Sequence, residues 1–491
     1  MLPDDILYLS VHELGAQILA RNISPVALTE SYLARLEKLG PKLGAVATLT
    51  PDLALQQARA AEKEIAAGHS RGPLHGIPYG AKDLLATRGI PTTWGAPPFK
   101  DQIFNYDATV IRKLREAGAI LVAKLAMIEL AGGGDYNNGN ASLQGPSRCP
   151  FNPEHWAGGS SSGPGAAVPA ALVGFALGSE TLGSIITPSA FSGVSGLRPT
   201  YGRVSRHGAM ALSWTMDKLG PMCRSAVDCG LVINAIAGND PLDATSRQEM
   251  FSWWPPTDTP HAKSLAGKRL GVVRPSFDAP GFGADPEVRH AFDAALDVLK
   301  TLGAKLSNIE LPDFPYSAVA VTLYTAEAAS IFRPFIESGK VNELIDDTQK
   351  AGLIAALSLR ATDYLDAMRI RAEILPAVGG LFQKYDALVS PSRNAPAPRL
   401  DVDFDAAPPP KSGEEKPATP PAGSFDKWNM IAMSNIAGLP AISVPCGFTK
   451  EKNLPIGIQF VADALREEVC IEFAHAYQWA TDWHRRRPTL S

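Results

Sequence analysis

The sequence predicts a globular α/β protein, in which helices and strands share one chain of 491 residues. Apolar residues make up 45% of it, an ordinary share for a chain with a sizeable buried core. Helix-like and strand-like segments also follow one another directly, and glycine marks some of their ends. The expected helices are 108–117, stopped by Gly118, and 286–302; the expected strands are 119–125, 269–273 and 304–311.

Residues 1–75 are expected to form three helices that pack over the rest of the chain. The run 10–13 (Ser-Val-His-Glu) has the form of a capping box, in which the Ser and Glu side chains each bond the other's backbone. Ser-Pro at 24–25 suits the start of a second helix, and Gly40 suits its end. A third helix is expected over 51–67.

The second half of the chain is expected to be mixed as well. Residues 400–423 are rich in Pro with Glu and Lys between, which predicts a long polar loop, either a lid or an excursion from the fold. The other expected elements are helices over 316–340, 343–378 and 467–483 and strands over 441–444 and 456–460.

The net charge and the cysteine content indicate which partners and which cellular compartment to expect. The net charge is −4, without the basic footprint of a protein that binds nucleic acid or an anionic membrane. The longest apolar run, 166–177, is interrupted by Pro169 and is too short to span a bilayer. Five irregularly spaced cysteines fit reduced thiols better than disulfides or a zinc site. With no signal peptide at the N-terminus, these features predict a soluble, cytoplasmic protein with no nucleic-acid and no membrane partner.

The stretch 158–188 carries the chemistry. It holds a serine triplet, 160–162, between glycines, and a lone Ser184 after Gly183. Small residues around hydroxyls bring backbone N–H groups and a nucleophile together, which acyl transfer needs. A base is offered by Lys82 in an apolar, turn-rich setting, because burial disfavours its charged form.

Two other hydrolase classes compete with this interpretation. Residues 159–163 match Gly-x-Ser-x-Gly, the nucleophile elbow of an α/β-hydrolase with Ser161 as nucleophile. That elbow follows a strand, whereas 149–158 has the composition of a loop. A metal hydrolase is disfavoured because the nine histidines are scattered and no H-E-x-x-H motif occurs. We therefore expect no metal and no cofactor.

In their order, the motifs resemble the amidase-signature family. The shared stretches are Gly76 to Asp83, Gly158 to Ser161, Gly178 to Ile185, Gly196 to Arg206, Asp217 to Pro221 and Asn435 to Pro445. The resemblance implies one domain over 1–491, with a central mixed twisted β-sheet covered by helices on both faces. Within it, 1–75 is the helical N-terminal part, 76–221 the catalytic core, 245–400 the variable substrate-pocket region, 400–423 the Pro-rich loop, and 424–491 the C-terminal part of the core.

The resemblance also implies a Ser-cisSer-Lys triad and an acyl-enzyme. Lys82 is the expected base, Ser160 the bridging serine after a cis peptide bond, and Ser184 the nucleophile. The backbone N–H groups expected to bind the oxyanion are those of Thr181, Leu182, Gly183 and Ser184. Leu182 departs from the family's usual glycine, which would strain the backbone if that position needed a positive φ. Asp83, Glu180 and Arg206 are expected to support the scaffold.

The residues around the nucleophile predict the substrate. Relatives carry Arg at the positions of Ile186 or Thr187, so their absence here predicts neutral, hydrophobic or aryl amides, with esters and carbamates (urethanes) as further substrates. The expected substrate-binding residues are Gly132, Gly133, Gly134 and Ile186. The expected partner is this small-molecule amide alone, with a homodimer left open. The alternative is one subunit of a glutamine- or asparagine-dependent amidotransferase that works with partners, against which Ile186 counts.

Overall fold

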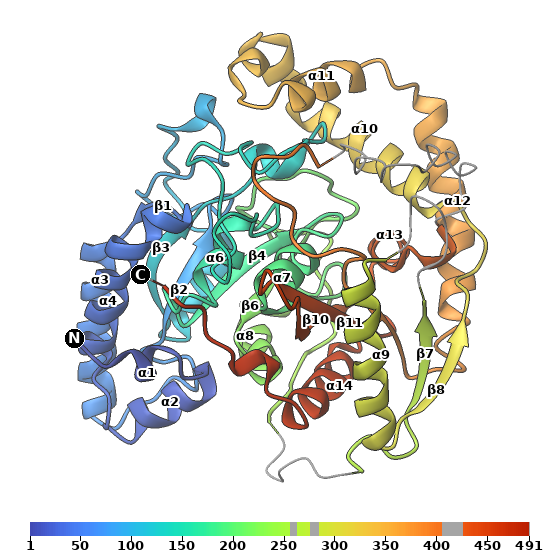
Figure 1. Cartoon of the computed structure of the whole chain (residues 1–491). Helices are drawn as coiled ribbons and strands as arrows, with labels where there is room; N and C mark the ends of the chain where they lie inside the picture. The colour runs from blue at the N-terminus through green and yellow to red at the C-terminus, as the bar shows by residue number, and fades with distance from the viewer. Residues whose placement is uncertain (256–262, 275–283, 405–425, 491) are drawn as a thin grey trace.

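A computed structural model describes residues 1–255, 263–274, 284–404 and 426–490. Its centre is an 11-stranded mixed sheet with the strand order β1-β3-β2-β4-β6-β5-β10-β11-β9-β7-β8 (Figure 1). The strands are β1 (Val46–Leu49), β2 (Pro78–Lys82), β3 (Ile120–Leu125), β4 (Phe175–Glu180), β5 (Ser195–Arg198), β6 (Lys218–Cys223), β7 (Arg269–Val273), β8 (Lys305–Ile309), β9 (Ala387–Pro391), β10 (Ala441–Phe448) and β11 (Pro455–Val461).

Helices pack on both faces of the sheet, as the resemblance implies (Figure 1). Along β3, Ile120 and Val122 join one apolar cluster and Leu121 joins another, because successive side chains of a strand point to opposite faces. The helices are α1 (Asp4–Leu7), α2 (Val11–Leu19), α3 (Pro25–Leu43), α4 (Pro51–Ala66), α5 (Thr109–Glu116), α6 (Ser162–Ala167), α7 (Ile186–Ser192), α8 (Ala226–Ile236), α9 (Pro286–Thr301), α10 (Tyr316–Glu337), α11 (Asp347–Ala356), α12 (Ala361–Gly379), α13 (Met430–Ile436) and α14 (Glu467–Trp479).

Three neighbouring strands position the candidate site. The strand β2 is parallel to both β3 and β4, so the carboxyl ends of the three strands meet at one edge of the sheet. Lys82 is the last residue of β2, and Glu180 is the last residue of β4. The loop after β4 leads directly into α7, which brings residues 181–185 to the same edge.

The N-terminal helices follow their sequence signals except at one end. Ser10 and Glu13 form the complete capping box of α2, and the Ser24 hydroxyl caps α3. The prediction that α3 ends at Gly40 is wrong, since the helix continues to Leu43 and ends at Gly44 in a left-handed conformation, φ +58°. Gly40 lies inside the helix, where a Cβ would stand 2.8 Å from Val46 Cγ2, so this glycine permits close packing against Val46 and does not end the helix.

Six strands, β1, β2, β4, β5, β6 and β9, were not predicted from the sequence. All of them except the half-buried β1 are buried along their whole length, so the alternation of polar and apolar residues that marks a half-exposed strand is lost. Most of the expected loop 400–423 lies outside the described residues. Within the described part of the chain, no helix is long and apolar enough to cross a membrane.

Candidate active site

Lys82 ends β2 with a fully buried side chain. Its Nζ donates to three hydroxyls, those of Ser160 at 2.7 Å, Ser179 at 2.9 Å and Ser161 at 3.1 Å. Burial lowers the pKa of Lys82 to about 7, and the more distant carboxylates of Asp217 and Glu180 oppose that shift only in part. At neutral pH a large fraction of Lys82 is therefore an uncharged amine, able to accept a proton.

The adjacent carboxylate of Asp83 pairs with a different lysine. Asp83 Oδ1 lies 2.9 Å from Lys124 Nζ, and both side chains are fully buried. The other oxygen accepts from the Thr93 N–H at 2.8 Å and from its hydroxyl at 2.5 Å. Asp83 is committed to this pair, and no carboxylate among the described residues contacts Lys82.

The serine triplet joins Lys82 to the rest of the site. The Gly159–Ser160 peptide bond is cis, as the resemblance implies. Ser161 is fully buried, and its hydroxyl bridges Lys82 to the backbone of Ser179, accepting from the N–H at 3.2 Å and donating to the carbonyl at 3.1 Å. No strand of the described sheet runs through 149–158. The nucleophile-elbow hypothesis, with an exposed Ser161 after a strand, therefore finds no support.

Glu180 anchors the loop between β4 and α7. Its Oε2 accepts from the N–H groups of Ile185 and Ile186 at 2.8 and 2.9 Å, while Oε1 contacts the Arg198 guanidinium at 2.7 Å and the Asn435 amide at 2.8 Å. Burial raises the pKa of Glu180, but Arg198 and the hydrogen bonds outweigh it and bring the pKa to about 2. A permanent buried charge thus holds the C-terminal side of the loop 181–184.

Ser184 lies in that loop and is half-buried. Its carbonyl accepts from the Ser161 N–H at 3.3 Å, but no described residue hydrogen-bonds its hydroxyl. The structure therefore makes the Lys82–Ser160 contact of the expected relay, while the Ser160–Ser184 contact is open. Gly183 has φ +93°, whereas Leu182 lies outside the left-handed region, so the leucine introduces no backbone strain.

The four backbone N–H groups expected to bind the oxyanion belong to this loop. None of them, from Thr181 to Ser184, donates to another described residue. The Thr181 hydroxyl donates to Asp217 at 2.6 Å, which fixes the other end of the loop. Unpaired N–H groups held on a loop anchored at both ends are suited to stabilise an oxyanion.

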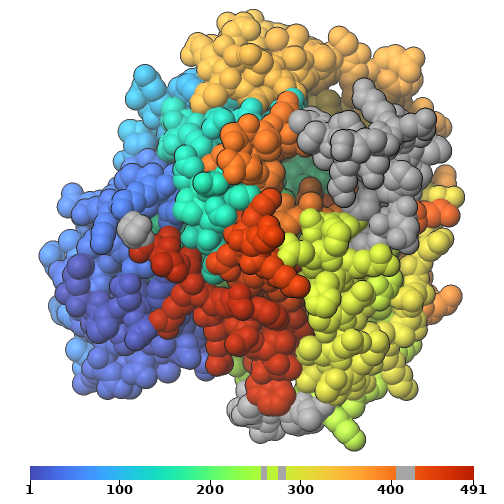
Figure 2. Space-filling view, viewed as in Figure 1, coloured from blue at the N-terminus to red at the C-terminus, as the bar shows by residue number. Residues whose placement is uncertain are grey.

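A cavity of about 390 Å³ opens beside Ser184. This volume suits a small molecule. In the space-filling view, a hollow is visible on the face shown, next to the orange segment that follows β9 (Figure 2). The lining combines aromatic rings with two charged side chains; it includes Tyr136, Trp156, Phe191, Tyr324, Phe404, Asp135 and Arg393.

The residues predicted to bind substrate differ in whether they line the cavity. Gly132 lines the cavity, whereas Gly133, Gly134 and Ile186 do not. Gly134 has φ +90°, and a Cβ on it would stand 2.5 Å from the Gln349 carbonyl, so this glycine permits the loop to pack on α11. Ile186 is fully buried in the apolar cluster that contains Met216 and Met433. An uncharged residue at 186 is therefore a feature of the core.

Sequence reasoning missed the polar groups on the outer wall of the cavity. Arg393 follows the unpredicted strand β9 by two residues, and Asp135 and Tyr136 directly follow the triple glycine. A charged residue just after a buried strand end was the available signal for Arg393, but the strand itself could not be recognised. Tyr324 lies within α10 and carried no signal.

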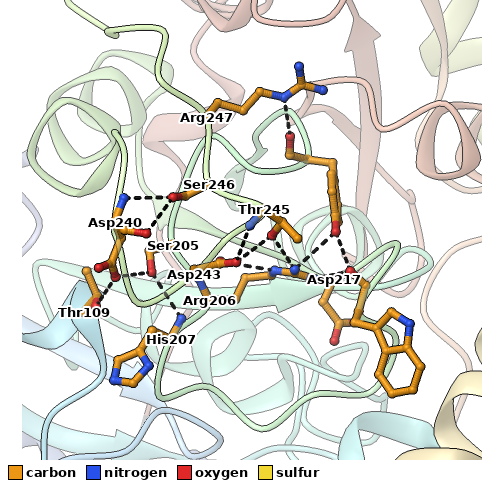
Figure 3. Close-up of polar contacts among 12 residues, drawn as sticks. Thr109, Ser205, Arg206, His207, Asp217, Asp240, Asp243, Thr245, Ser246 and Arg247 are labelled. Carbon is orange, nitrogen blue, oxygen red and sulfur yellow. Dashed lines mark hydrogen bonds and ion pairs between the residues drawn. The ribbon is translucent and has the colours of Figure 1, made fainter.

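Arg206 belongs to a separate polar cluster (Figure 3). Its guanidinium donates to the Thr245 hydroxyl at 2.6 Å and lies 3.5 Å from the Asp243 carboxylate. Arg206 does not line the cavity beside Ser184. The guanidinium also donates to the Trp214 carbonyl at 2.6 Å, which ties the segment leading to Asp217 to this cluster and fits a scaffold role.

Comparison with known proteins gives the family, which is one of hydrolases of carbon–nitrogen bonds. The Amidase family profile matches residues 27–471, and the chain belongs to this family. It is 36% identical to the A subunit of glutamyl-tRNA(Gln) amidotransferase from Moorella thermoacetica, over 99% of each chain. Peptide amidase from Stenotrophomonas maltophilia aligns with a TM-score of 0.80 and 28% identity over 96% of each chain. A chain from a vestigial protein complex, described as revealing the origins of an s-triazine catabolic enzyme, aligns with a TM-score of 0.83 and 27% identity, over 96% of this chain and 98% of that one.

These comparisons overturn two predictions. The neutral, hydrophobic amide substrate is wrong, because the full-length relative is one subunit of an amidotransferase. The structural reason is that Ile186, on which the prediction depended, does not reach the cavity, while Arg393 and Asp135 do. The prediction of a small molecule as sole partner, with no nucleic acid, is also wrong, since that relative belongs to an enzyme named for a tRNA. Net charge cannot reveal such a role, because one subunit can leave the phosphate contacts to another.

Proposed function

We propose that the chain is the amide-cleaving subunit of an amidotransferase. It hydrolyses the side-chain amide of glutamine or asparagine and supplies the ammonia to an acceptor handled by partner chains, in an assembly that acts on tRNA. The observation that carries this proposal is the similarity to an amidotransferase subunit over 99% of each chain, in a chain whose Ser184 faces a small cavity with charged walls. The buried Lys82–Ser160 contact beneath that cavity supplies the base. We place this activity in the cytoplasm.

The proposed reaction moves one proton along a short relay. Neutral Lys82 takes the proton of Ser160, which takes that of Ser184 after a rotation of the Ser184 side chain. Ser184 Oγ attacks the amide carbon, and the N–H groups of residues 181–184 stabilise the oxyanion. The proton returns through Ser160 to the amide nitrogen, the carbon–nitrogen bond breaks, and ammonia leaves an ester on Ser184. Water, deprotonated through the same relay, attacks the ester and releases glutamate or aspartate.

Ammonia release from glutamine and asparagine by the purified chain tests this proposal. We expect stoichiometric ammonia and amino-acid product, and a hydroxamate when hydroxylamine intercepts the acyl-enzyme. Ser184→Ala should abolish both, with a loss of about 10⁴-fold or more, because the residues of such a relay act as a unit. Cleavage of a neutral anilide without any release from glutamine or asparagine would overturn the proposal.

A further inference from the structure

The three hydroxyls that contact Lys82 have different surroundings. Ser160 and Ser161 are fully buried, as is Lys82 itself, whereas Ser179 keeps 9% of its surface exposed. The Ser161 hydroxyl is committed, because it donates to the Ser179 carbonyl at 3.1 Å and accepts from the Ser179 N–H at 3.2 Å. Ser179 Oγ accepts from Lys82 Nζ at 2.9 Å, and its own O–H donates to no described residue. Ser179 is therefore able to accept a proton from Lys82 and to donate one elsewhere.

Ser179 lines a second cavity, of about 210 Å³, and does not line the Ser184 cavity. Ser184, in turn, does not line the second cavity. The two cavities share a wall formed by Ala131, Thr181 and Leu212. The second cavity is also lined by Trp214 and Leu242, which are 43% and 66% exposed, so it reaches the surface of the molecule.

The polar cluster around Arg206 forms part of the lining of the second cavity. Its members Arg206, His207, Asp217 and Asp243 all line that cavity (Figure 3). A cavity of this size with polar walls is suited to hold water. Asp217 also carries the charge that most opposes the lowering of the Lys82 pKa, so its carboxylate favours a proton on this side of the amine.

The reaction leaves a proton behind if the ammonia is to react further. An amide and water then give a carboxylate, neutral ammonia and one proton, because a side-chain acid with a pKa of about 4 ionises at neutral pH. Burial lowers the pKa of Lys82 to about 7, which still makes its amine a stronger base than the product carboxylate. The proton therefore comes to rest on Lys82, which must lose it before the next turnover.

We propose that Ser179 is the proton exit of the active site, connecting Lys82 to water in the second cavity. The N–H bond of the Lys82 ammonium breaks as a new O–H bond forms on Ser179, and the original Ser179 proton passes to water. This inference rests on the proposed release of ammonia and adds a residue and a route to it. The route is separate from Ser160, which serves the Ser184 side, and it stays open while a ligand occupies the Ser184 cavity.

Replacing Ser179 by alanine removes the hydroxyl and tests the exit. Because the exit follows the chemical steps, we expect kcat for glutamine to fall at least about tenfold while kcat/KM changes less than about threefold. Rapid quenching should show the first equivalent of glutamate formed at the wild-type rate, followed by slow turnover. Imidazole, a small proton carrier, should raise the kcat of this variant in proportion to its concentration. Ser179→Thr keeps a hydroxyl and should retain most of the wild-type kcat.

The matched control is Ser161→Ala, which also removes a hydroxyl from Lys82 but one that does not line the second cavity. We expect no burst of glutamate and no rescue by imidazole in this variant. If kcat and kcat/KM fall together in Ser179→Ala and imidazole has no effect, Ser179 only positions Lys82 and the proposal is overturned.

An activated ester separates this inference from the proposed function. p-Nitrophenyl acetate acylates nucleophilic serines without a dedicated binding site, and its hydrolysis also leaves a proton in the active site. If the chain cleaves this ester but releases no ammonia from glutamine or asparagine, the proposed function fails. An acetate burst with imidazole rescue in Ser179→Ala would then still support the exit. Glutamine cleavage with a kcat that is unaffected by Ser179→Ala would support the function and overturn the exit.

Discussion

Two buried lysines on neighbouring strands differ in whether a carboxylate contacts the amine. Lys82 ends β2, and Lys124 lies on the parallel strand β3, in register with Ala81. Lys124 faces the Asp83 carboxylate at 2.9 Å, whereas the described groups at hydrogen-bonding distance from Lys82 are all hydroxyls. Burial lowers the pKa of both amines. The carboxylate in contact with Lys124 opposes that effect directly, but the carboxylates acting on Lys82 are more distant.

The comparison shows how an adjacent Lys-Asp pair can leave its lysine without a counter-ion. Successive side chains of an extended segment point in opposite directions, so Lys82 and Asp83 diverge although they are bonded neighbours. Asp83 then pairs across to β3, and Lys82 turns to the serines. One lysine holds the strand ends together, and the other is left available for proton transfer.

Replacing Lys82 should have the largest effect on activity. We expect Lys82→Met to lower kcat/KM for glutamine about 10³-fold or more, because the relay loses its proton acceptor. The fold should persist, since Met has a similar length and no carboxylate in the described part of the chain contacts Lys82. Steady-state kinetics and thermal unfolding measure the two effects. Activity within tenfold of wild type would show that another group is the base.

Replacing Lys124 should have the opposite signature. Lys124→Met leaves the Asp83 carboxylate buried without its cation, which costs about 3–5 kcal/mol of unfolding free energy. Turnover per folded molecule should change little, because Lys124 does not contact the serines. Denaturant unfolding monitored beside active-site titration measures both. Unchanged stability together with lost turnover would contradict the structural role.

Sequence reasoning was most successful where a motif fixes geometry locally. The cis bond before Ser160 and the Lys82–Ser160 contact agree with the motif, whose glycines permit backbone conformations that other residues avoid. Half-exposed helices such as α9 were also found, since their apolar stripe has the helical period. The catalytic roles of these residues stay predictions until they are measured.

The outer wall of the cavity could not be predicted in the same way. Asp135, Tyr324 and Arg393 are far apart in sequence, and tertiary packing alone brings them to one cavity. No periodicity links them, and the strand before Arg393 is buried along its length. The prediction that Ile186 binds substrate was wrong for a related reason. A residue close to Ser184 in the sequence need not point its side chain into the same cavity.

The pH dependence of glutamine cleavage tests the state of Lys82. Since burial lowers its pKa to about 7, the neutral amine predominates above that pH and the protonated form below it. We expect kcat/KM to rise about tenfold per unit below pH 7 and to level off above pH 8. Initial rates from pH 5 to 10 measure the profile, and solvent isotope effects show whether proton transfer limits the rate. A profile that keeps rising to pH 10 would show that Lys82 retains the pKa of an exposed lysine.

The smallest effect is expected when both members of the Asp83–Lys124 ion pair are replaced. In Asp83→Asn with Lys124→Met no buried charge is left unpaired, so we expect unfolding free energy within about 1–2 kcal/mol of wild type, recovering most of the loss caused by Lys124→Met alone. The apparent pKa in the rate profile should also stay near its wild-type value, because Asp83 does not contact Lys82. If Asp83 instead stabilised the protonated form of Lys82, its loss would lower that apparent pKa by about one unit. Such a shift would show that the Asp83 carboxylate acts on both lysines. The difference in counter-ion between Lys82 and Lys124 would then be disproved.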